Sequence, residues 1–263
     1  MLNGLDLFSG IGGITTALDG YVRPLVYCES DRYCQAVLLS NQQQGFLPCA
    51  PIWDDVRTLQ ADYFPNVDII YGGFPCQDIS VAGTGRGLDG ERSGLFFEIV
   101  RLCRDIRPRF VFLENVPAIT VRGLDRVCLE LTAMGYDCRW TIVSASELGA
   151  CHLRERWFML AYSDRGDIWS ESVELTKCEA EVISELNEYQ RDVAYANGER
   201  LEGFRGSESR ISRPCVYNGW NSQPVLRRGA HGLSSRVDRV KGLGNAVVPI
   251  QAREAFERLC GLK

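Results

Sequence analysis

The chain has 263 residues, of which 45% are apolar and 24% charged, so it can bury one sizeable core. This composition excludes a disordered, a collagen-like and a membrane-spanning chain. The formal net charge of −5, from 34 acidic and 29 basic residues, argues mildly against a general polyanion binder. The 11 cysteines are scattered and no two are separated by two residues, so we expect free thiols and no metal site. The chain begins without a basic, apolar leader, and we expect a cytoplasmic protein.

Short apolar runs alternate with helical patterns over the first 162 residues. The expected strands are Gly4–Phe8, Pro24–Glu29, Val67–Gly72, Phe110–Asn115, Tyr136–Ser144 and Arg156–Tyr162. The expected helices are Gly13–Leu18, Tyr33–Ser40, Leu95–Arg107 and, near the end, Ala246–Leu259. This alternation predicts an α/β fold with a mostly parallel, doubly wound sheet, whose sites lie at the carboxyl ends of the strands.

Charge is distributed unevenly after residue 162. Residues 163–199 contain ten acidic and three basic side chains, and their apolar residues recur three and four apart, which predicts an amphipathic helix. Residues 200–241 contain nine basic and three acidic side chains, together with Phe204, Tyr217 and Trp220. Basic and aromatic side chains interleaved in this way are typical of a region that binds a polyanion. The overall charge therefore averages two segments of opposite sign.

The segment Asp6–Gly13 runs from the first expected strand into a glycine-rich turn and then into a helix. Glycines at such a turn let the backbone approach a nucleotide-like ligand closely, at the amino end of the next helix. Glu29 ends the second strand, where a carboxylate can accept hydrogen bonds from ribose hydroxyls. Asp55 follows at a third strand end, where it can accept a hydrogen bond from an exocyclic amine. The glycines alone also fit NAD binding or a simple tight turn.

Cys76 lies in the segment Gly72–Gln77, directly after the apolar run Val67–Tyr71. A cysteine at the carboxyl end of a central strand, in a loop stiffened by Pro75, is well placed to be an exposed nucleophile. We interpret the other ten cysteines as small buried apolar residues.

Two further motifs place polar side chains beside the same strand ends. Glu114 and Asn115 end a buried strand, where burial can raise the pKa of the carboxyl so that it holds and donates a proton. Arg154 and Arg156 alternate in an extended segment, which predicts two guanidinium groups on one side of it. Such a pair suits a base carbonyl and a phosphate.

Taken in order, these motifs resemble the cytosine C5 DNA methyltransferase family, and most closely its small phage and prophage members. The match covers residues 4–162 and about 225–258, and it includes Leu-Phe-Phe at 95–97 and Gly-Asn-Ala-Val at 244–247. The resemblance implies a Rossmann-like fold that uses S-adenosyl-L-methionine as its cofactor. By this resemblance the cofactor-binding positions are Phe8, Gly10, Gly12, Glu29, Asp55, Leu95, Asn245 and Val247.

The resemblance also implies roles for five residues in catalysis. Cys76 adds to carbon 6 of a cytosine, and Glu114 holds the proton on ring nitrogen 3. Asn115 shapes the loop around Cys76. Arg156 holds the cytosine carbonyl, and Arg154 contacts a backbone phosphate. The target base must flip out of the duplex, and residues 78–94 are expected to close over it. His152 and Ala82 depart from the Gln and Ser that are usual in the family.

We expect three parts in the chain. Residues 1–162 form the catalytic and cofactor-binding domain, residues 163–238 a small target-recognition region, and residues 239–263 a segment that returns to the catalytic domain. The resemblance implies double-stranded DNA as the partner and a role in DNA methylation or restriction-modification, in a bacterium or a phage-infected cell. We further expect a monomer without a metal.

Three alternatives remain open at this point. One branch of the family keeps the same catalytic residues and methylates cytosine in tRNA. A nicotinamide-dependent dehydrogenase fits the glycine turn but has no use for Cys76 with Glu114. A catalytically inactive DNA-binding relative is the third, and the intact Cys76, Glu114 and arginine pair argue against it.

Overall fold

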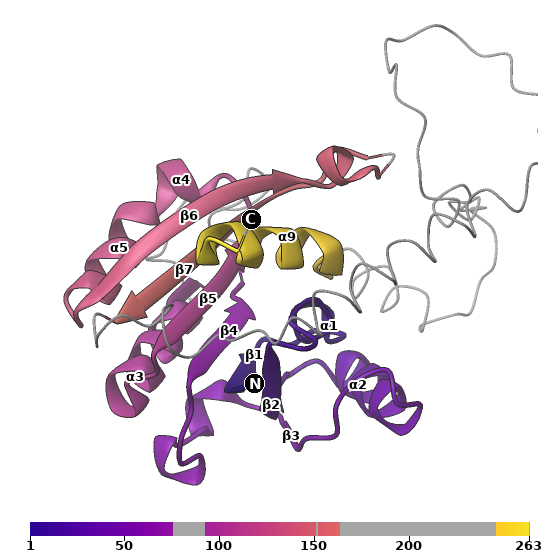
Figure 1. Ribbon diagram of the computed structural model, residues 1–263. Coiled ribbons are helices and arrows are strands. Elements are labelled where there is room, and N and C mark those ends of the chain that lie inside the picture. Colours follow the sequence, from indigo (N-terminus) through magenta and orange to yellow (C-terminus); the bar gives the residue numbers. More distant parts are fainter. Residues whose placement is uncertain (76–92, 151, 164–245, 263) are drawn as a thin grey trace, which may run out of the picture.

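A seven-stranded sheet forms the centre of the part of the chain that the structure describes (Figure 1). The computed structural model describes residues 1–75, 93–150, 152–163 and 246–262. The strands are β1 (Leu2–Leu7), β2 (Val22–Cys28), β3 (Ile52–Trp53), β4 (Ile69–Gly73), β5 (Phe110–Asn115), β6 (Tyr136–Ser144) and β7 (Glu155–Ser163). Their order across the sheet is β3-β2-β1-β4-β5-β7-β6. Strand β7 is antiparallel to both of its neighbours, whereas β1 to β5 pair in parallel.

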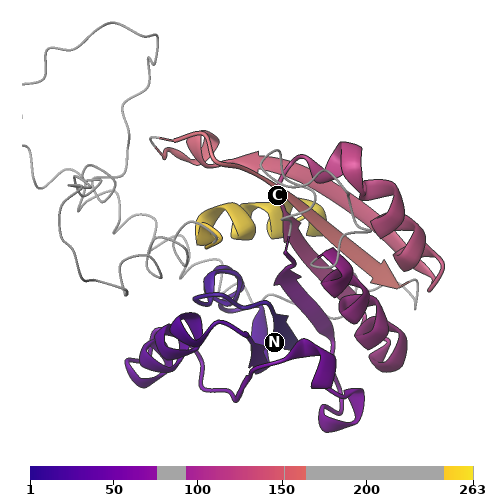
Figure 2. The same cartoon turned by 180° about the vertical axis from the view of Figure 1, so that it is seen from behind.

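Helices cover both faces of this sheet (Figures 1 and 2). They are α1 (Gly13–Ala17), α2 (Arg32–Gln43), α3 (Phe96–Ile106), α4 (Ile119–Arg122), α5 (Leu124–Thr132) and α9 (Pro249–Cys260). Alternate residues of β5 serve the two faces: Val111 and Leu113 belong to the core under α3 and α5, and Phe112 to the core under α1 and α9. The Phe112 ring packs against Phe256 of α9, with their centroids 5.3 Å apart. A central strand that is apolar on both sides is therefore buried on both sides.

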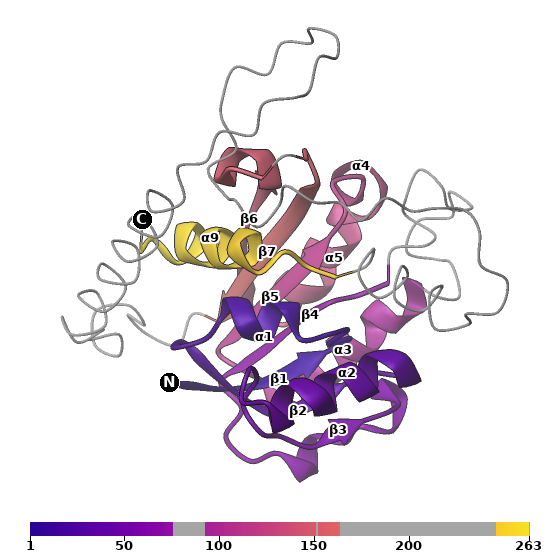
Figure 3. The ribbon, with the colours of Figure 1, turned by 90° about the vertical axis from the view of Figure 1, so that its right-hand side faces the viewer.

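The C-terminal helix α9 is far in sequence from the strands of the sheet but packs against them (Figure 3). It begins at Pro249, which suits the first turn of a helix, and ends at Gly261 with a φ of 73°. Its buried residues join α1 and strands β6 and β7 in one core. The residues just before it, Ala246 and Val247, consequently lie at the carboxyl ends of the central strands.

The predicted α/β class and mostly parallel sheet are confirmed. The strand end predicted before Asp55 exists as β3, although no range was predicted for that strand, and helices α4 and α5 were not predicted. β3 has only two residues, so it carries no apolar run. Helices α4 and α5 are short and share Gly123 as a boundary, which hides their helical period in the sequence. The prediction that Arg154 is extended is wrong, because its φ is 25° and β7 begins one residue later.

Several expectations fall outside the described residues. They concern Cys76, Asn245, most of the loop at 78–94, the acidic helix, the basic stretch and nearly all of the target-recognition region. Seven cysteines are described, and all seven are free thiols. Four of them are buried as predicted, but Cys128 and Cys138 are half-buried, and the prediction is wrong for Cys49, which is exposed. Within the described ranges, no helix is long and apolar enough to cross a membrane, and no three metal-ligating side chains cluster together.

Candidate active site

A small pocket opens where the carboxyl ends of β1, β4 and β5 meet. Its lining is Phe8, Ser9, Gly10, Ile11, Gly13, Ile14, Gly73, Glu114, Ala246 and Val247. The strands that supply these residues are parallel neighbours, so their carboxyl ends lie at one edge of the sheet. The predicted glycine turn and the predicted Glu114 are thus brought together, and Val247 joins them from the other end of the chain.

The glycine-rich turn is held by the carboxylate of Glu29. Its Oε2 accepts a hydrogen bond from the backbone N–H of Gly10 at 2.7 Å, and its Oε1 accepts one from Asp31 at 2.7 Å. Phe8 has a φ of 57°, which is costly for a residue with a side chain. At Gly10, with a φ of 56°, a Cβ would meet nothing within 4 Å, so the backbone there borders open space. The turn therefore presents bare backbone beside a carboxylate.

Glu114 lies in the pocket opposite a glycine that makes room for it. A Cβ at Gly73, its cross-strand neighbour, would lie 2.6 Å from Oε2 of Glu114. The other oxygen, Oε1, forms an ion pair with Nε of Arg156 at 3.0 Å. Burial raises the pKa of Glu114 to about 7, and the positive charges of Arg156 and Arg154 only partly offset this effect. At neutral pH the carboxyl can therefore both hold and release a proton.

Asn115 connects β5 to the segment that leads to Cys76. Its Nδ2 donates a hydrogen bond to the carbonyl of Phe74 at 3.2 Å, and its Oδ1 accepts one from Val116 at 2.8 Å. The side chain is 2% exposed, so water does not compete for these bonds. Phe74 precedes Cys76 by two residues, and Cys76 itself is outside the described part.

The two predicted arginines reach different partners. Arg156 points at Glu114, from the strand next to β5. Arg154 is half-buried, and its guanidinium donates to the backbone carbonyl of Ala246. Burial and the nearby charge of Arg156 lower the pKa of Arg154. The two guanidinium charges therefore lie near enough to act on each other, although Arg154 and Arg156 do not belong to one extended segment.

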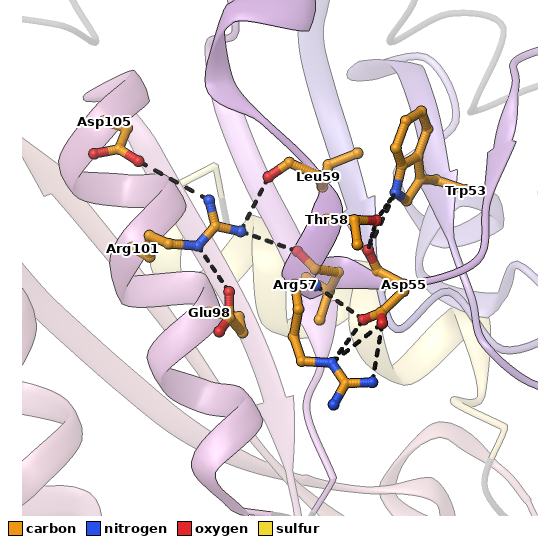
Figure 4. Close-up of polar contacts among 9 residues, drawn as sticks. Trp53, Asp55, Arg57, Thr58, Leu59, Glu98, Arg101 and Asp105 are labelled. Carbon is orange, nitrogen blue, oxygen red and sulfur yellow. Dashed lines mark hydrogen bonds and ion pairs between the residues drawn. The ribbon is translucent and has the colours of Figure 1, made fainter.

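Asp55 follows β3 and caps a short 3-10 helix, Val56–Thr58 (Figure 4). Its carboxylate accepts from the backbone N–H of Arg57 at 3.0 Å and from the guanidinium of Arg57 at 2.9 to 3.2 Å. Arg101 of α3 donates to the carbonyls of Val56 and Leu59, both at 3.0 Å. The arginine thereby ties the Asp55 turn to α3, and the residue that caps α3 is the predicted cofactor residue Leu95. Sequence reasoning did not identify Arg101.

A buried polar chain under the glycine turn was also missed. Oδ2 of Asp6 accepts from the Thr15 hydroxyl at 2.6 Å, and that hydroxyl lies 2.8 Å from the Tyr71 hydroxyl. Oδ1 of Asp6 has no hydrogen-bond partner among the described residues, and the side chain is 1% exposed. Burial raises the pKa of Asp6 to about 7. The alternation of β1 could have placed Asp6 on an inner face, but its partners come from α1 and β4.

This burial predicts a pH-dependent stability. A carboxyl with a raised folded-state pKa favours folding while protonated, so its contribution is full below about pH 4 and is lost as the pH rises through about 7. Between about pH 4 and pH 7, Asp6 should therefore lower the free energy of unfolding of the wild type by an amount on the order of 3 kcal/mol. We expect Asp6→Asn to lack this decline. Urea unfolding at a series of pH values measures it, with the exposed Asp62→Asn as the control. A wild-type profile in Asp6→Asn would contradict the assignment.

The sheet order with its one reversed strand, together with a glycine turn beside an acidic strand end, defines the α/β fold of S-adenosylmethionine-dependent methyltransferases. A family model described as C-5 cytosine-specific DNA methylase matches residues 2–215. The chain therefore belongs to the C-5 cytosine-specific DNA methylase family, and the family resemblance of the sequence is confirmed.

Individual relatives agree with this family. The chain is 36% identical over 159 residues to the Type II methyltransferase M.CviJI of a Paramecium bursaria Chlorella virus, an alignment that covers 60% of this chain and 42% of that protein. It is 30% identical over 216 residues to the Type II methyltransferase M.DsaV of Dactylococcopsis salina, covering 78% and 58%. The chain thus spans about half the length of these relatives.

A solved structure shows the same likeness. It is a crystal structure described as that of a DNA modification methyltransferase encoded within an E. coli prophage. Its TM-score is 0.51 at 27% sequence identity, and the superposition covers 62% of this chain and 47% of that one.

Proposed function

We propose that this protein is a DNA (cytosine-5-)-methyltransferase, which transfers a methyl group from S-adenosyl-L-methionine to carbon 5 of a cytosine in duplex DNA. The observation that carries the proposal is Glu114, which lines the same pocket as the glycine turn and pairs with Nε of Arg156 at 3.0 Å. The relatives are named as methyltransferases, which supports the reaction type. The family description names cytosine in DNA, which supports the substrate.

The residues of the pocket fit the proposed cofactor. The turn at Gly10 leaves open space where a side chain would stand, and the Glu29 carboxylate lies beside it to accept hydrogen bonds from hydroxyls. Phe8, Gly12, Leu95, Asn245 and Val247 are proposed to complete the site. Asp55 is proposed to accept from an exocyclic amine. When bound, S-adenosyl-L-methionine supplies an electrophilic methyl group.

The chemistry on the base is proposed to begin at Cys76. Its thiolate adds to carbon 6 of the cytosine, which makes carbon 5 nucleophilic. Glu114 donates a proton to ring nitrogen 3 as the addition proceeds, and a pKa of about 7 suits that transfer at neutral pH. Arg156, anchored to Glu114, holds the cytosine carbonyl. Once carbon 5 carries the methyl group, loss of its proton and of the Cys76 thiol, with return of the nitrogen 3 proton to Glu114, restores the ring.

The proposed substrate is duplex DNA with the target base flipped out. Flipping costs a few kcal/mol, which contacts in the pocket offset. Five arginines of the basic stretch are proposed to contact phosphates or guanines: Arg205, Arg210, Arg213, Arg227 and Arg228. Arg154 is proposed to contact a phosphate near the catalytic loop. The division into 1–162, 163–238 and 239–263, and action as a monomer without a metal, belong to the same proposal.

One experiment tests the function. The purified protein is incubated with labelled S-adenosyl-L-methionine and either duplex DNA or tRNA, and modified cytosines are mapped by sequencing. We expect label in duplex DNA, at one short recurring sequence, on carbon 5. Label in tRNA alone would favour the RNA-modifying branch, and label in neither polymer would contradict the proposal.

A further inference from the structure

A buried glutamine of α9 connects the C-terminal part of the chain to the arginine segment, residues 152–156. Nε2 of Gln251 donates to the carbonyl of Val143 at 3.0 Å and to the carbonyl of Arg154 at 2.7 Å. The side chain is 0% exposed, and its Oε1 has no hydrogen-bond partner in the described part of the chain. An amide is costly to bury when it is not fully paired.

The arginine segment also donates a hydrogen bond to the C-terminal segment. The guanidinium of Arg154 donates to the carbonyl of Ala246, five residues before Gln251. Two hydrogen bonds of opposite direction therefore join the same two segments, residues 152–156 and 246–251. Arg154 also has a φ of 25°, a conformation that costs free energy and persists only where neighbours enforce it. Gln251 holds the carbonyl of that strained residue.

The same C-terminal segment also packs against the glycine turn. A Cβ at Gly13 would lie 2.8 Å from the carbonyl of Val247, so turn and segment approach as closely as a glycine allows. Ala246 and Val247 line the pocket together with Phe8 and Glu114. The segment 246–251 thus touches the proposed cofactor side of the pocket through Gly13 and the proposed base side through Arg154.

We infer that Gln251 is a positioning residue, which fixes the arginine segment so that Arg156 meets Glu114 in the geometry needed for the target base. The inference rests on the proposed function for its effect on catalysis. Gln251 acts through the carbonyl of Arg154, and Arg156 lies two residues further on and pairs with Glu114 at 3.0 Å.

Anchoring of the helix alone does not require an amide at this position. The buried face of α9 already has apolar side chains packed into the core: Ala252, Ala255, Phe256 and Leu259. An apolar residue in place of Gln251 would extend that face. An apolar side chain could not, however, donate hydrogen bonds to the carbonyls of Val143 and Arg154.

The test compares Gln251→Met with wild type. Methionine keeps the length and apolar volume of glutamine but cannot donate. We expect kcat to fall about 10- to 100-fold, because a displacement near 1 Å at a reacting group costs about that much. KM for S-adenosyl-L-methionine should change much less than kcat. Hydrogen exchange at residues 152–157 should be faster than in wild type.

Gln42→Met is the matched control. Gln42 is a second buried glutamine, on α2, whose Oε1 accepts a hydrogen bond from the backbone of Ala50 at 2.9 Å, away from the arginine segment. It should lower stability without the same loss of kcat and without faster exchange at 152–157. Gln251→His, which keeps one N–H donor, should recover part of the kcat and of the exchange protection. It also serves as the test variant if Gln251→Met does not fold.

Two results would overturn the inference. One is wild-type kcat and wild-type exchange protection in Gln251→Met or, where that variant does not fold, in Gln251→His. The other is an equal loss of kcat in Gln42→Met. If wild-type protein methylates no nucleic acid, the proposed function fails, and the exchange comparison still decides whether Gln251 fixes the arginine segment.

Discussion

Cys76→Ala should abolish methyl transfer to duplex DNA, an expected loss on the order of 10⁴-fold or more, and should leave binding of S-adenosyl-L-methionine nearly unchanged. Without the thiolate nothing adds to carbon 6 of the base, so carbon 5 stays unreactive. The glycine turn and Glu29, which are proposed to hold the cofactor, follow β1 and β2, and a hydrogen bond between Gly10 and Glu29 joins them directly. Filter binding of labelled DNA product measures transfer, and calorimetry measures cofactor binding.

Cys49→Ala is the matched control for Cys76→Ala. Cys49 is an exposed free thiol distant in sequence from every proposed catalytic residue. Its removal should leave both the rate and cofactor binding as in wild type. Retained turnover in Cys76→Ala, or an equal loss in Cys49→Ala, would contradict the assignment of the nucleophile.

Glu114→Gln lowers kcat by about 10²- to 10⁴-fold, the usual contribution of a positioned proton donor. The amide keeps the size of the carboxyl but transfers no proton to nitrogen 3. It also cancels the negative charge that pairs with Nε of Arg156. Folding should be preserved, because the ionised carboxyl is itself disfavoured by burial.

The pH dependence distinguishes proton transfer from simple positioning by Glu114. Since burial raises the pKa of Glu114 to about 7, the protonated form predominates below that pH and is lost above it. Wild-type kcat/KM should therefore decline on the alkaline side with an apparent pKa of about 7, and the residual rate of Glu114→Gln should lack that limb. An identical alkaline limb in Glu114→Gln would assign the titration to another group.

Most of the sheet was predictable because its strands are short apolar runs that end in distinctive polar residues. Phe110–Asn115 is apolar up to its last two residues, and both the strand and its ends agree with β5. β3 was not predictable because two residues are too few for an apolar run, and α4 and α5 were not predictable because Gly123 interrupts their helical period.

The candidate site was likewise predictable from the sequence only in part. The placement of Glu114 beside the glycine turn follows from strand ends meeting at one sheet edge, and this much could be predicted from the sequence. Its pairing with Arg156 depends on the reversal of β7 next to β5, which the order of motifs does not reveal. The carbonyls that Arg101 and Gln251 reach are 42 or more residues away, and Thr15 reaches Asp6 from the helix after the glycine turn, so no local pattern indicates these contacts.

The most direct test of the proposed mechanism uses duplex DNA with 5-fluorocytosine at the mapped target site. Fluorine at carbon 5 cannot leave as a proton does, so the enzyme should remain covalently attached to the DNA after methyl transfer. Mass spectrometry of the digested complex should locate the attachment on Cys76. No covalent complex on a site that the enzyme methylates, or attachment to another residue, would contradict the proposed mechanism.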